Sequence, residues 1–303
     1  MEDASNATFR SGFVALVGRP NAGKSTLLNA CLGHKVAITS NVPQTTRKRL
    51  RAVVNTPNSQ LVIVDTPGLH KPKDALGKEL NRAALGELAE VDVVAMLVDA
   101  SAPVGGGDAW VAKHVSACDA FRLLVVTKAD LVSPDQAIAQ YEAAMALGEF
   151  DDGIVLSAQE GFNVDAFVEL VSANLPGGPR WSPEDMETDA TTEDLVAEYV
   201  REKVLLNCRQ EIPHSVGVIC DSIDFARDGH ASVTATVMVE RESQKGIVVG
   251  KGGSMIKRIG SSARRDIERL LGCKVFLDLE VEVRPMWRRD ANEIRRLGYD
   301  AGE

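Results

Sequence analysis

The sequence predicts two domains: a doubly wound α/β domain with a mostly parallel sheet, followed by a smaller α+β domain. In the first part, short runs rich in Val, Ile and Leu alternate with helical patterns, as in a parallel sheet buried on both faces. A stretch dense in Pro, Gly, Thr and acidic residues then interrupts the alternation. Behind it, the order changes to helix, two strands, helix and strand. A chain of 303 residues is long enough for both domains.

The α/β domain is expected at 1–176 and a linker at 177–194. The first strand is placed where an apolar run leads directly into Gly18, and the helix behind it carries leucines on one face. The expected strands are 13–17, 61–64, 93–98, 123–126 and 154–156, and the helices between the later strands are 78–90, 109–117, 134–147 and 164–175.

The smaller domain is expected at 195–303. Its predicted elements, in order, are a helix at 195–209, strands at 216–225 and 231–240, a helix ending at Leu271 and a strand at 274–283. A break in the second helix is expected near Gly260. The apolar run Ile247, Val248 and Val249 is expected in the core of a strand.

Charge is distributed unevenly between the two parts. Residues 1–240 hold 20 Lys and Arg against 33 Asp and Glu, whereas residues 241–303 hold 14 against 10. The basic end therefore favours an anionic partner, although the whole chain carries a net charge of −9. The five scattered cysteines form no Cys-x-x-Cys pair, which argues against disulfides and cysteine zinc sites. The acidic N-terminus and the lack of a long apolar run predict a cytoplasmic protein.

A glycine-rich loop between the first strand and the first helix fits the pattern G-x-x-x-x-G-K-[ST]. Backbone N–H groups in such a loop surround phosphate oxygens, and the helix N-terminus adds its dipole. Lys24 is expected to neutralise the β- and γ-phosphates, and Ser25 to offer its hydroxyl to Mg²⁺. The predicted loop consists of Gly18, Arg19, Pro20, Asn21, Ala22, Gly23, Lys24, Ser25 and Thr26.

A second motif, Asp65-Thr66-Pro67-Gly68, follows the next strand of the predicted sheet. The carboxyl ends of parallel strands meet at one edge of a sheet, so this motif is expected beside the phosphate loop. Asp65 would hold Mg²⁺ through a water molecule, and the Gly68 N–H would meet the γ-phosphate.

The third and fourth motifs follow the last two strands and point to guanine. The carboxylate of Asp130 can accept from two neighbouring donors on the guanine ring, a pair that adenine lacks. Lys128 is expected over the ring, and Thr127 begins the same motif and is expected in the nucleotide site. Ser157 and Ala158 would supply a backbone donor to the guanine carbonyl. Together with the phosphate loop, these motifs predict a guanine-nucleotide site.

With these motifs, the segment Pro43-Gln44-Thr45-Thr46-Arg47 and the basic C-terminal part, the chain resembles the Era family of GTPases over nearly its whole length. The resemblance implies a P-loop GTPase domain in which water attacks the γ-phosphate. It also implies that 38–49 is the first switch and that Thr46, favoured over Thr45, reaches Mg²⁺ when GTP is bound. The implied catalytic residues are Lys24, Thr46, Gly68 and Asn21, and the implied metal ligands are Ser25, Thr46 and Asp65.

Two residues depart from the wider GTPase pattern. Thr127 replaces the usual Asn, which other small GTPases tolerate. Leu69 occupies the position of a water-orienting Gln, so slow intrinsic hydrolysis is expected. Asn21 is a candidate for compensating for the missing Gln, because relatives with Asn at this position use it to hold K⁺ against the phosphates.

In the second domain, Gly250-Lys251-Gly252-Gly253 forms a G-x-x-G loop before a basic helix. Such loops clamp about four backbone nucleotides in KH domains, because glycine lets the RNA backbone approach closely. The resemblance implies type II KH topology and a target near the 3′ end of 16S rRNA. The predicted RNA contacts are Gly250, Lys251, Gly252, Gly253, Lys257, Arg258, Arg264 and Arg265.

We therefore interpret the chain as a monomeric GTPase that acts as a nucleotide-gated switch in assembly of the 30S ribosomal subunit. One alternative is an RNA-binding module whose G domain scarcely hydrolyses nucleotide. Another is an ATP-driven RNA remodelling enzyme, against which Asp130 argues. A third is a tRNA-modifying or tandem-G-domain relative, against which the single phosphate loop argues. Family likeness leaves contact with the inner face of the cell membrane open, although no lipidation motif or amphipathic basic helix supports it.

Overall fold

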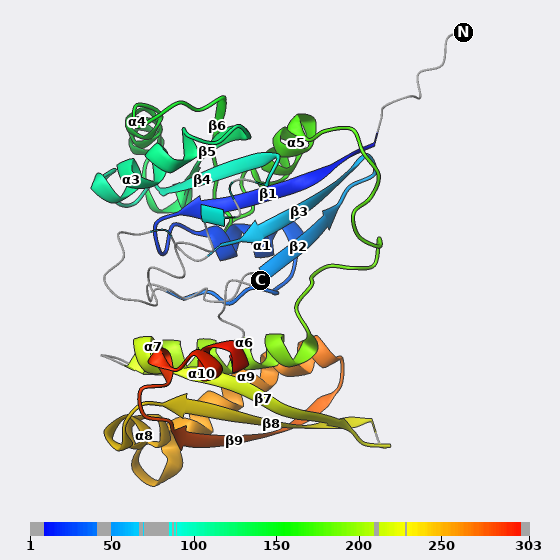
Figure 1. The fold of residues 1–303 in the computed structure, drawn as a ribbon, viewed down its shortest axis with the longest axis vertical. Helices are drawn as coiled ribbons and strands as arrows, with labels where there is room; N and C mark the ends of the chain where they lie inside the picture. Colours follow the sequence, from blue (N-terminus) through cyan, green and yellow to red (C-terminus); the bar gives the residue numbers. More distant parts are fainter. Residues whose placement is uncertain are drawn as a thin grey trace. The chain divides into compact units, whose positions relative to one another are not determined.

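The computed structural model describes residues 9–40, 50–66, 69, 85–86, 88, 90–208, 212–227 and 229–297. These residues form two compact units, shown in Figure 1. Described residues up to Ala37 and from Leu50 to Asp189 belong to the first unit. The second unit contains Ala190 to Leu297 together with a short segment that begins at Ile38.

The first unit is built around a six-stranded sheet with the order β2-β3-β1-β4-β5-β6. Only β2 runs antiparallel, paired with β3. This confirms the predicted doubly wound fold and adds β2, which the sequence analysis missed. The strands are β1 (Arg10–Gly18), β2 (Leu50–Asn55), β3 (Ser59–Asp65), β4 (Val93–Asp99), β5 (Phe121–Thr127) and β6 (Asp152–Val155).

Helices cover both faces of this sheet (Figure 1). Helices α1 (Lys24–Leu32) and α5 (Val164–Asn174) share one apolar cluster with Val14 and Leu16 of β1. Helices α3 (Gly106–Val115) and α4 (Pro134–Met145) share the other cluster with the alternate residues of β1. The two-residue period of a strand thus explains why β1 is buried throughout its centre. The helix expected at 78–90 lies mostly outside the described residues.

The second unit has a three-stranded sheet, β7 (Gly217–Phe225), β8 (His230–Val239) and β9 (Lys274–Val283), in that order. β8 is antiparallel to β7 and parallel to β9. The helices are α6 (Thr192–Asn207), α7 (Ile212–Ser215), α8 (Glu242–Val249), α9 (Ser254–Leu271) and α10 (Ala291–Arg296). Short 3₁₀ turns occur at Ala129–Leu131 (η1), Lys251–Gly253 (η2) and Trp287–Arg289 (η3).

Two predictions for this unit were wrong. The run Ile247 to Val249 ends helix α8 rather than forming a strand; Val248 enters the core while Ile247 is exposed. Gln244 closes the start of α8 by accepting from the N–H groups of Glu240 and Arg241. Helix α9 continues through Gly260 without a break. In both places, packing against the sheet outweighs local propensity.

The segment predicted as a linker follows the edge strand β2 as far as Asp189. The Gln60 side chain accepts from the N–H groups of Trp181 and Ser182, at 2.7 and 2.9 Å, and donates to the Ser182 carbonyl. The N–H of Val53 in β2 donates to the Glu187 carbonyl at 2.9 Å. We call residues 177–189 the strap. The strap belongs to the first unit, and α6 begins soon after it, with Thr191 as its N-cap.

Candidate nucleotide site and nucleic-acid groove

The phosphate loop has the backbone conformation of an anion-binding site. Asn21 and Gly23 have φ angles of 66° and 91°, and α1 begins directly after Gly23. Such alternation turns successive N–H groups towards one point, at the positive end of the helix dipole. Asn is among the few residues other than glycine that adopt positive φ readily, which supplies a conformational reason for Asn21.

Lys24 is the first residue of α1, directly behind this loop, and is only 6% exposed. Its Nζ is 3.4 Å from the Gly18 carbonyl oxygen and 3.3 Å from that of Arg19, which are long hydrogen bonds. Burial lowers the pKa of Lys24, and nearby Asp65 acts in the opposite direction. A buried ammonium held by weak bonds is well suited to exchange carbonyl partners for phosphate oxygens.

The side chains of Ser25 and Asp65 meet at the start of α1 and the end of β3. Ser25 Oγ donates to Asp65 Oδ2 at 2.7 Å, and Asp65 is fully buried. A hydroxyl and a carboxylate are the hard oxygen donors that Mg²⁺ prefers, so this pair fits the predicted metal. Thr46, Pro67 and Gly68 lie outside the described residues, and their roles stay predictions.

Two residues predicted to bind nucleotide direct their side chains elsewhere. The Thr66 hydroxyl donates to the Leu16 carbonyl at 2.8 Å within the sheet. Leu69 is fully buried in the apolar cluster shared with α3, and its N–H donates to the Gly18 carbonyl. Leu69 therefore steadies the phosphate loop through its backbone and contributes no group that could orient water.

Arg19 contributes its backbone to the loop, while its side chain is held by α3. Its Nε lies 3.0 Å from the carboxylate of Asp108, which is 1% exposed. A Cβ at Gly107 would come within 2.7 Å of Arg19 Cδ, so the glycine makes room for the side chain. The spacing of the motifs gave no indication of Asp108.

Thr127 joins the guanine motif to the phosphate loop. Its hydroxyl lies 2.8 Å from the Ala22 carbonyl oxygen and 3.2 Å from that of Val98. Because the hydroxyl reaches the loop backbone directly, Thr serves here as a bridge between the two motifs.

The residues predicted to read guanine come together at the ends of β5 and β6. Ser157 Oγ donates to Asp130 Oδ1 at 2.5 Å, which orients an otherwise exposed carboxylate. Ala158 follows Ser157 directly. Lys128 has a φ of 58° and its Nζ lies 2.6 Å from Asp99 Oδ2, at the end of β4.

Asp99 is a site residue that the sequence analysis missed. Its partial burial alone would raise its pKa, but Lys128 and Ser101 outweigh this effect and hold the pKa of the carboxyl below its ordinary value. Its position at a strand end, level with the other motifs, was the available signal.

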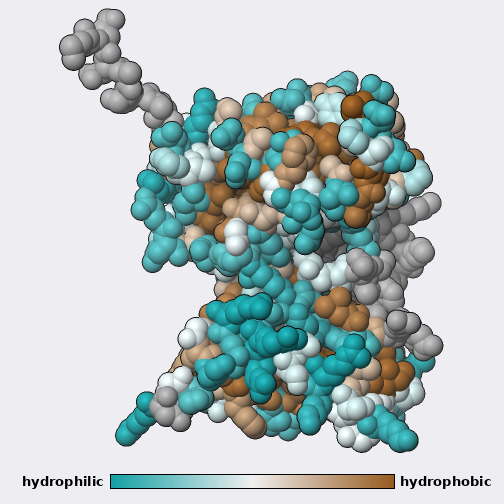
Figure 2. All heavy atoms as spheres, turned by 180° about the vertical axis from the view of Figure 1, so that it is seen from behind, coloured by the Kyte–Doolittle hydropathy of each residue, from teal (hydrophilic) through white to brown (hydrophobic). Residues whose placement is uncertain are grey.

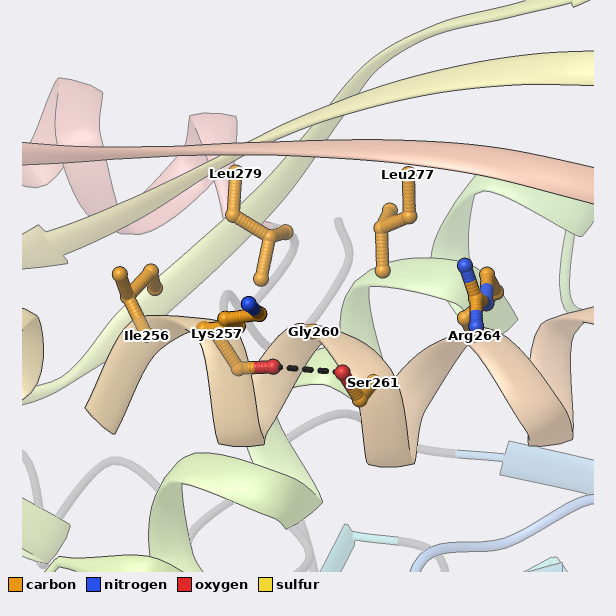
Figure 3. A pocket seen from close by; sticks show the side chains of 7 residues that line it. All are labelled: Ile256, Lys257, Gly260, Ser261, Arg264, Leu277 and Leu279. Carbon is orange, nitrogen blue, oxygen red and sulfur yellow. Dashed lines mark hydrogen bonds between the residues drawn. The ribbon is translucent and has the colours of Figure 1, made fainter. Parts of the chain in front are cut away.

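The second unit contains a pocket of about 330 Å³ between α9 and β9. Figure 3 shows Leu277 and Leu279 of β9 projecting towards the helix, with Lys257 and Arg264 on the opposite wall. The pocket thus combines an apolar floor with a basic rim. The remaining lining residues are Ile256, Gly260 and Ser261.

Glycines form the loop at the N-terminal end of α9. Gly250, Gly252 and Gly253 have φ angles of 73°, 59° and 77°. A Cβ at Gly250 would lie 2.6 Å from Met255 Cβ, so packing requires glycine there. A Cβ at Gly252 or Gly253 would meet no described atom within 4 Å, which leaves the loop open to an external backbone.

The pocket separates the predicted RNA contacts into two groups. Lys257 and Arg264 line it, whereas Arg258 and Arg265 are exposed on α9 outside its lining. Leu277 and Leu279 were missed as lining residues, although their alternation with Asp278 and Glu280 in β9 signalled a half-buried strand. Figure 2 shows hydrophilic residues over much of the visible face of this unit, with hydrophobic patches between them.

No described helix combines the length and the apolar character needed to cross a bilayer.

The fold and the site define a P-loop GTPase followed by a KH domain. Residues 13–128 match the family described as 50S ribosome-binding GTPase, and residues 211–288 match the KH domain family. A crystal structure of Era in complex with MgGDPNP and nucleotides 1506-1542 of 16S ribosomal RNA is 36% identical, with a TM-score of 0.92. The match covers 96% of this chain and 99% of that chain.

A second structure, of an Aquifex aeolicus Era variant with one tyrosine changed to alanine and bound to GDP.AlF4-, is 35% identical with a TM-score of 0.92. That match covers 96% of this chain and 100% of the other. The chain belongs to the Era family and is a GTPase.

Proposed function

We propose that this GTPase binds 16S rRNA near its 3′ end and acts in the cytoplasm, as a monomer, as a nucleotide-gated switch in 30S subunit assembly. The observation that carries the proposal is the pocket between α9 and β9, which lies along the helix that follows the glycine loop. An Era relative complexed with 16S rRNA nucleotides 1506-1542 supports the choice of RNA.

In the G domain, Lys24 and the loop N–H groups would stabilise the negative charge that develops as water attacks the γ-phosphate. Ser25 and Asp65 would hold Mg²⁺, which supplies electrostatic stabilisation of the phosphates when bound. Asp130, oriented by Ser157, would select guanine. The buried Leu69 leaves water orientation to another group, so the unstimulated rate is expected to be slow.

In the KH domain, the glycine loop would clamp the RNA backbone while unstacked bases enter the pocket. Lys257 and Arg264 would pair with phosphates at its rim, and Leu277 and Leu279 would contact base faces. Each phosphate neutralised by these side chains would add to the salt dependence of binding.

The decisive experiment titrates an RNA from the 3′ end of 16S rRNA into the protein with GDP or a non-hydrolysable GTP analogue. We expect tighter binding with the GTP analogue. Gly252→Asp should abolish binding, because it places a carboxylate where the RNA phosphate must approach. Gly252→Asn is the matched control, since Asn has nearly the same shape, tolerates positive φ and carries no charge.

Three results would count against parts of this function. Equal affinity with both nucleotides would leave RNA binding and remove the gating. Equal losses for the Asp and Asn variants would remove the phosphate clamp. No measurable single-turnover hydrolysis, with or without RNA, would favour the binding module that holds nucleotide without using it.

We further propose that Asn21 helps to hold K⁺ against the phosphates, where the ion would supply positive charge to the transition state. GTP turnover should then be at least about tenfold faster in KCl than in NaCl, a difference of about 1.4 kcal/mol in the barrier. Asn21→Gly, which keeps access to positive φ, should remove the preference. Equal rates of the unaltered protein in both salts would exclude this role.

A further inference from the structure

The first residues of the predicted switch belong to the second unit, not to the nucleotide-binding unit. Ile38 is 4% exposed and is part of the apolar core formed by α6, α9 and the three-stranded sheet. Its neighbour Ala37 lies in the core of the first unit, where the Asn29 side chain bonds its N–H and carbonyl, both at 2.8 Å. Two consecutive residues thus belong to different units.

The residue after Ile38 is bonded to helix α6. The N–H of Thr39 donates to Glu202 Oε1 at 3.0 Å, and Glu202 is 3% exposed. Amide hydrogen bonds to a buried carboxylate are among the stronger ones in proteins. Glu202 therefore fixes the backbone at the beginning of the switch.

The second carboxylate oxygen of Glu202 contacts Lys203, which also contacts α9, the helix proposed to bind RNA. Lys203 Nζ lies 2.5 Å from Glu202 Oε2 and 2.5 Å from Asp266 Oδ2 on α9. Asp266 in turn pairs with Arg269 at 3.2 Å. Three consecutive polar contacts thus connect Thr39 with a helix that forms one wall of the pocket.

The Lys203 ammonium is held between two acidic groups in a largely buried place. Burial lowers its pKa, but the two carboxylates outweigh that effect, and the pKa of Lys203 lies above its ordinary value. Tyr199, one helical turn earlier, lies in the same negatively charged surroundings. Burial, Asp266 and Glu202 raise the pKa of Tyr199 to about 12. Removing any one charge would leave the others without compensation in a poorly solvated place, so the contacts should shift together.

On the basis of the proposed RNA switch, we infer that Glu202 is a positioning residue that couples the first switch to α9. When nucleotide draws the switch towards Mg²⁺, the Thr39 N–H moves and its hydrogen bond to Glu202 is altered. The ion pairs of Lys203 with Glu202 and Asp266 then readjust, and this shifts α9 at the pocket wall. Glu202 touches neither nucleotide nor RNA in this scheme. Its removal should therefore alter the dependence of RNA affinity on nucleotide, with RNA binding itself retained.

The test compares Glu202→Gln with Glu198→Gln, one helical turn apart on α6. Glu198 is also in an ion pair, with Arg201 at 2.6 Å, but has no contact with the relay among the described residues. For each protein, RNA affinity is measured with GDP and with a non-hydrolysable GTP analogue. Thermal unfolding and nucleotide affinity are measured alongside to show that each variant is folded.

We expect the unaltered protein and Glu198→Gln to bind RNA about tenfold or more tightly with the GTP analogue, and Glu202→Gln to show less than about a twofold difference. Asp266→Asn, which interrupts the relay at its far end without touching Thr39, should lose the difference too. Hydrogen exchange of α9 should respond to nucleotide in the unaltered protein and not in these two variants.

If Glu202→Gln keeps the full nucleotide dependence, the coupling is overturned. If Glu202→Gln loses it but Asp266→Asn keeps it, the relay through Lys203 is overturned. If the unaltered protein itself shows no nucleotide dependence, the gating in the proposed function fails first, which distinguishes that failure from a failure of the relay.

Discussion

At the scale of single residues, the nucleotide site depends on side chains that hold other side chains. Ser157 orients Asp130, Asp99 holds Lys128, and Thr127 ties the guanine motif to the phosphate loop. Each motif residue follows a strand within a few positions, and this is the signal from which the sequence predicts them. Asp99 had the same strand-end signal, whereas Asp108 lies in α3 and becomes a neighbour of Arg19 only when the sheet forms.

Changing the carboxylate that is predicted to read guanine should change the base that is bound. In Asp130→Asn, one acceptor becomes a donor, so GDP affinity should fall by about 100-fold or more, given about 1.5–3 kcal/mol for each charged hydrogen bond. Xanthosine diphosphate, which presents a carbonyl where guanine has an amino group, should bind the variant better than GDP. Competition against a fluorescent nucleotide measures both. A variant that still prefers GDP would show that Asp130 does not read the base.

Asp99 should contribute stability that depends on pH. Folding lowers the pKa of Asp99, so its carboxylate stabilises the protein at pH values above the pKa of the unfolded state, near 3.8. This contribution is lost as the pH falls through the pKa of the folded state. Since the pair is partly exposed, Asp99→Asn should cost only about 1 kcal/mol or less at neutral pH, or about 2–4 °C in unfolding temperature. Unfolding scans should show the difference shrinking below about pH 4. A constant difference down to about pH 3 would contradict it.

At the scale of elements, helix α9 contains a glycine that helix propensity disfavours and that the pocket accommodates. Gly260 is unfavourable in a helix interior, which led to the predicted break, yet α9 is continuous and the glycine faces Leu279 across the pocket. The strand predicted at Ile247 to Val249 was wrong for the same reason. The strand propensity of β-branched residues carries no information about what the segment packs against. The missed strand β2 had a signal: a Thr-Pro-Asn-Ser turn between two apolar runs.

Substitutions at Gly260 should separate stability from RNA binding. Gly260→Ala should stabilise the helix by about 0.5–1 kcal/mol, because Ala loses less backbone freedom than Gly on folding. The added Cβ would lie 3.4 Å from Leu279 Cδ1 and therefore fits. Gly260→Leu should instead fill the pocket and weaken RNA binding at least about tenfold, or about 1.4 kcal/mol. Calorimetry and RNA titration measure the two effects.

Ser262→Leu on the same helix, outside the pocket lining, is the control for added apolar bulk. Unchanged RNA affinity in Gly260→Leu, or an equal loss in Ser262→Leu, would show that bases do not occupy the pocket.

At the scale of the whole molecule, composition predicted a linker at 177–194 between the two domains. The prediction depended on Pro, Gly and acidic residues, which are typical of irregular backbone. They gave no sign that this strap bonds an edge strand more than a hundred residues earlier, as Asn55 does with the Glu184 carbonyl. The early segment at Ile38 likewise joins the second unit through contacts that only the folded chain creates.

Fragments of the first unit should differ according to whether they include the strap. A fragment of residues 1–176 would leave the outer N–H groups of β2, including that of Val53, without their strap partners. Such an edge invites pairing with another copy. We expect this fragment to self-associate and a fragment of residues 1–189 to stay monomeric, as measured by light scattering during size-exclusion chromatography. Two monodisperse fragments with equal unfolding temperatures would contradict the role of the strap.

The strap is synthesised well after the strand that it covers. Asn55 and Glu184 are separated by 129 positions, so at about 5–20 residues per second a ribosome takes roughly 6–26 s to deliver the partner of β2. Throughout that interval the nascent sheet has an uncovered edge. Slow translation or crowded polysomes should therefore endanger this protein more than its finished fold would suggest, and a chaperone that shields the edge would matter most before residue 189 emerges.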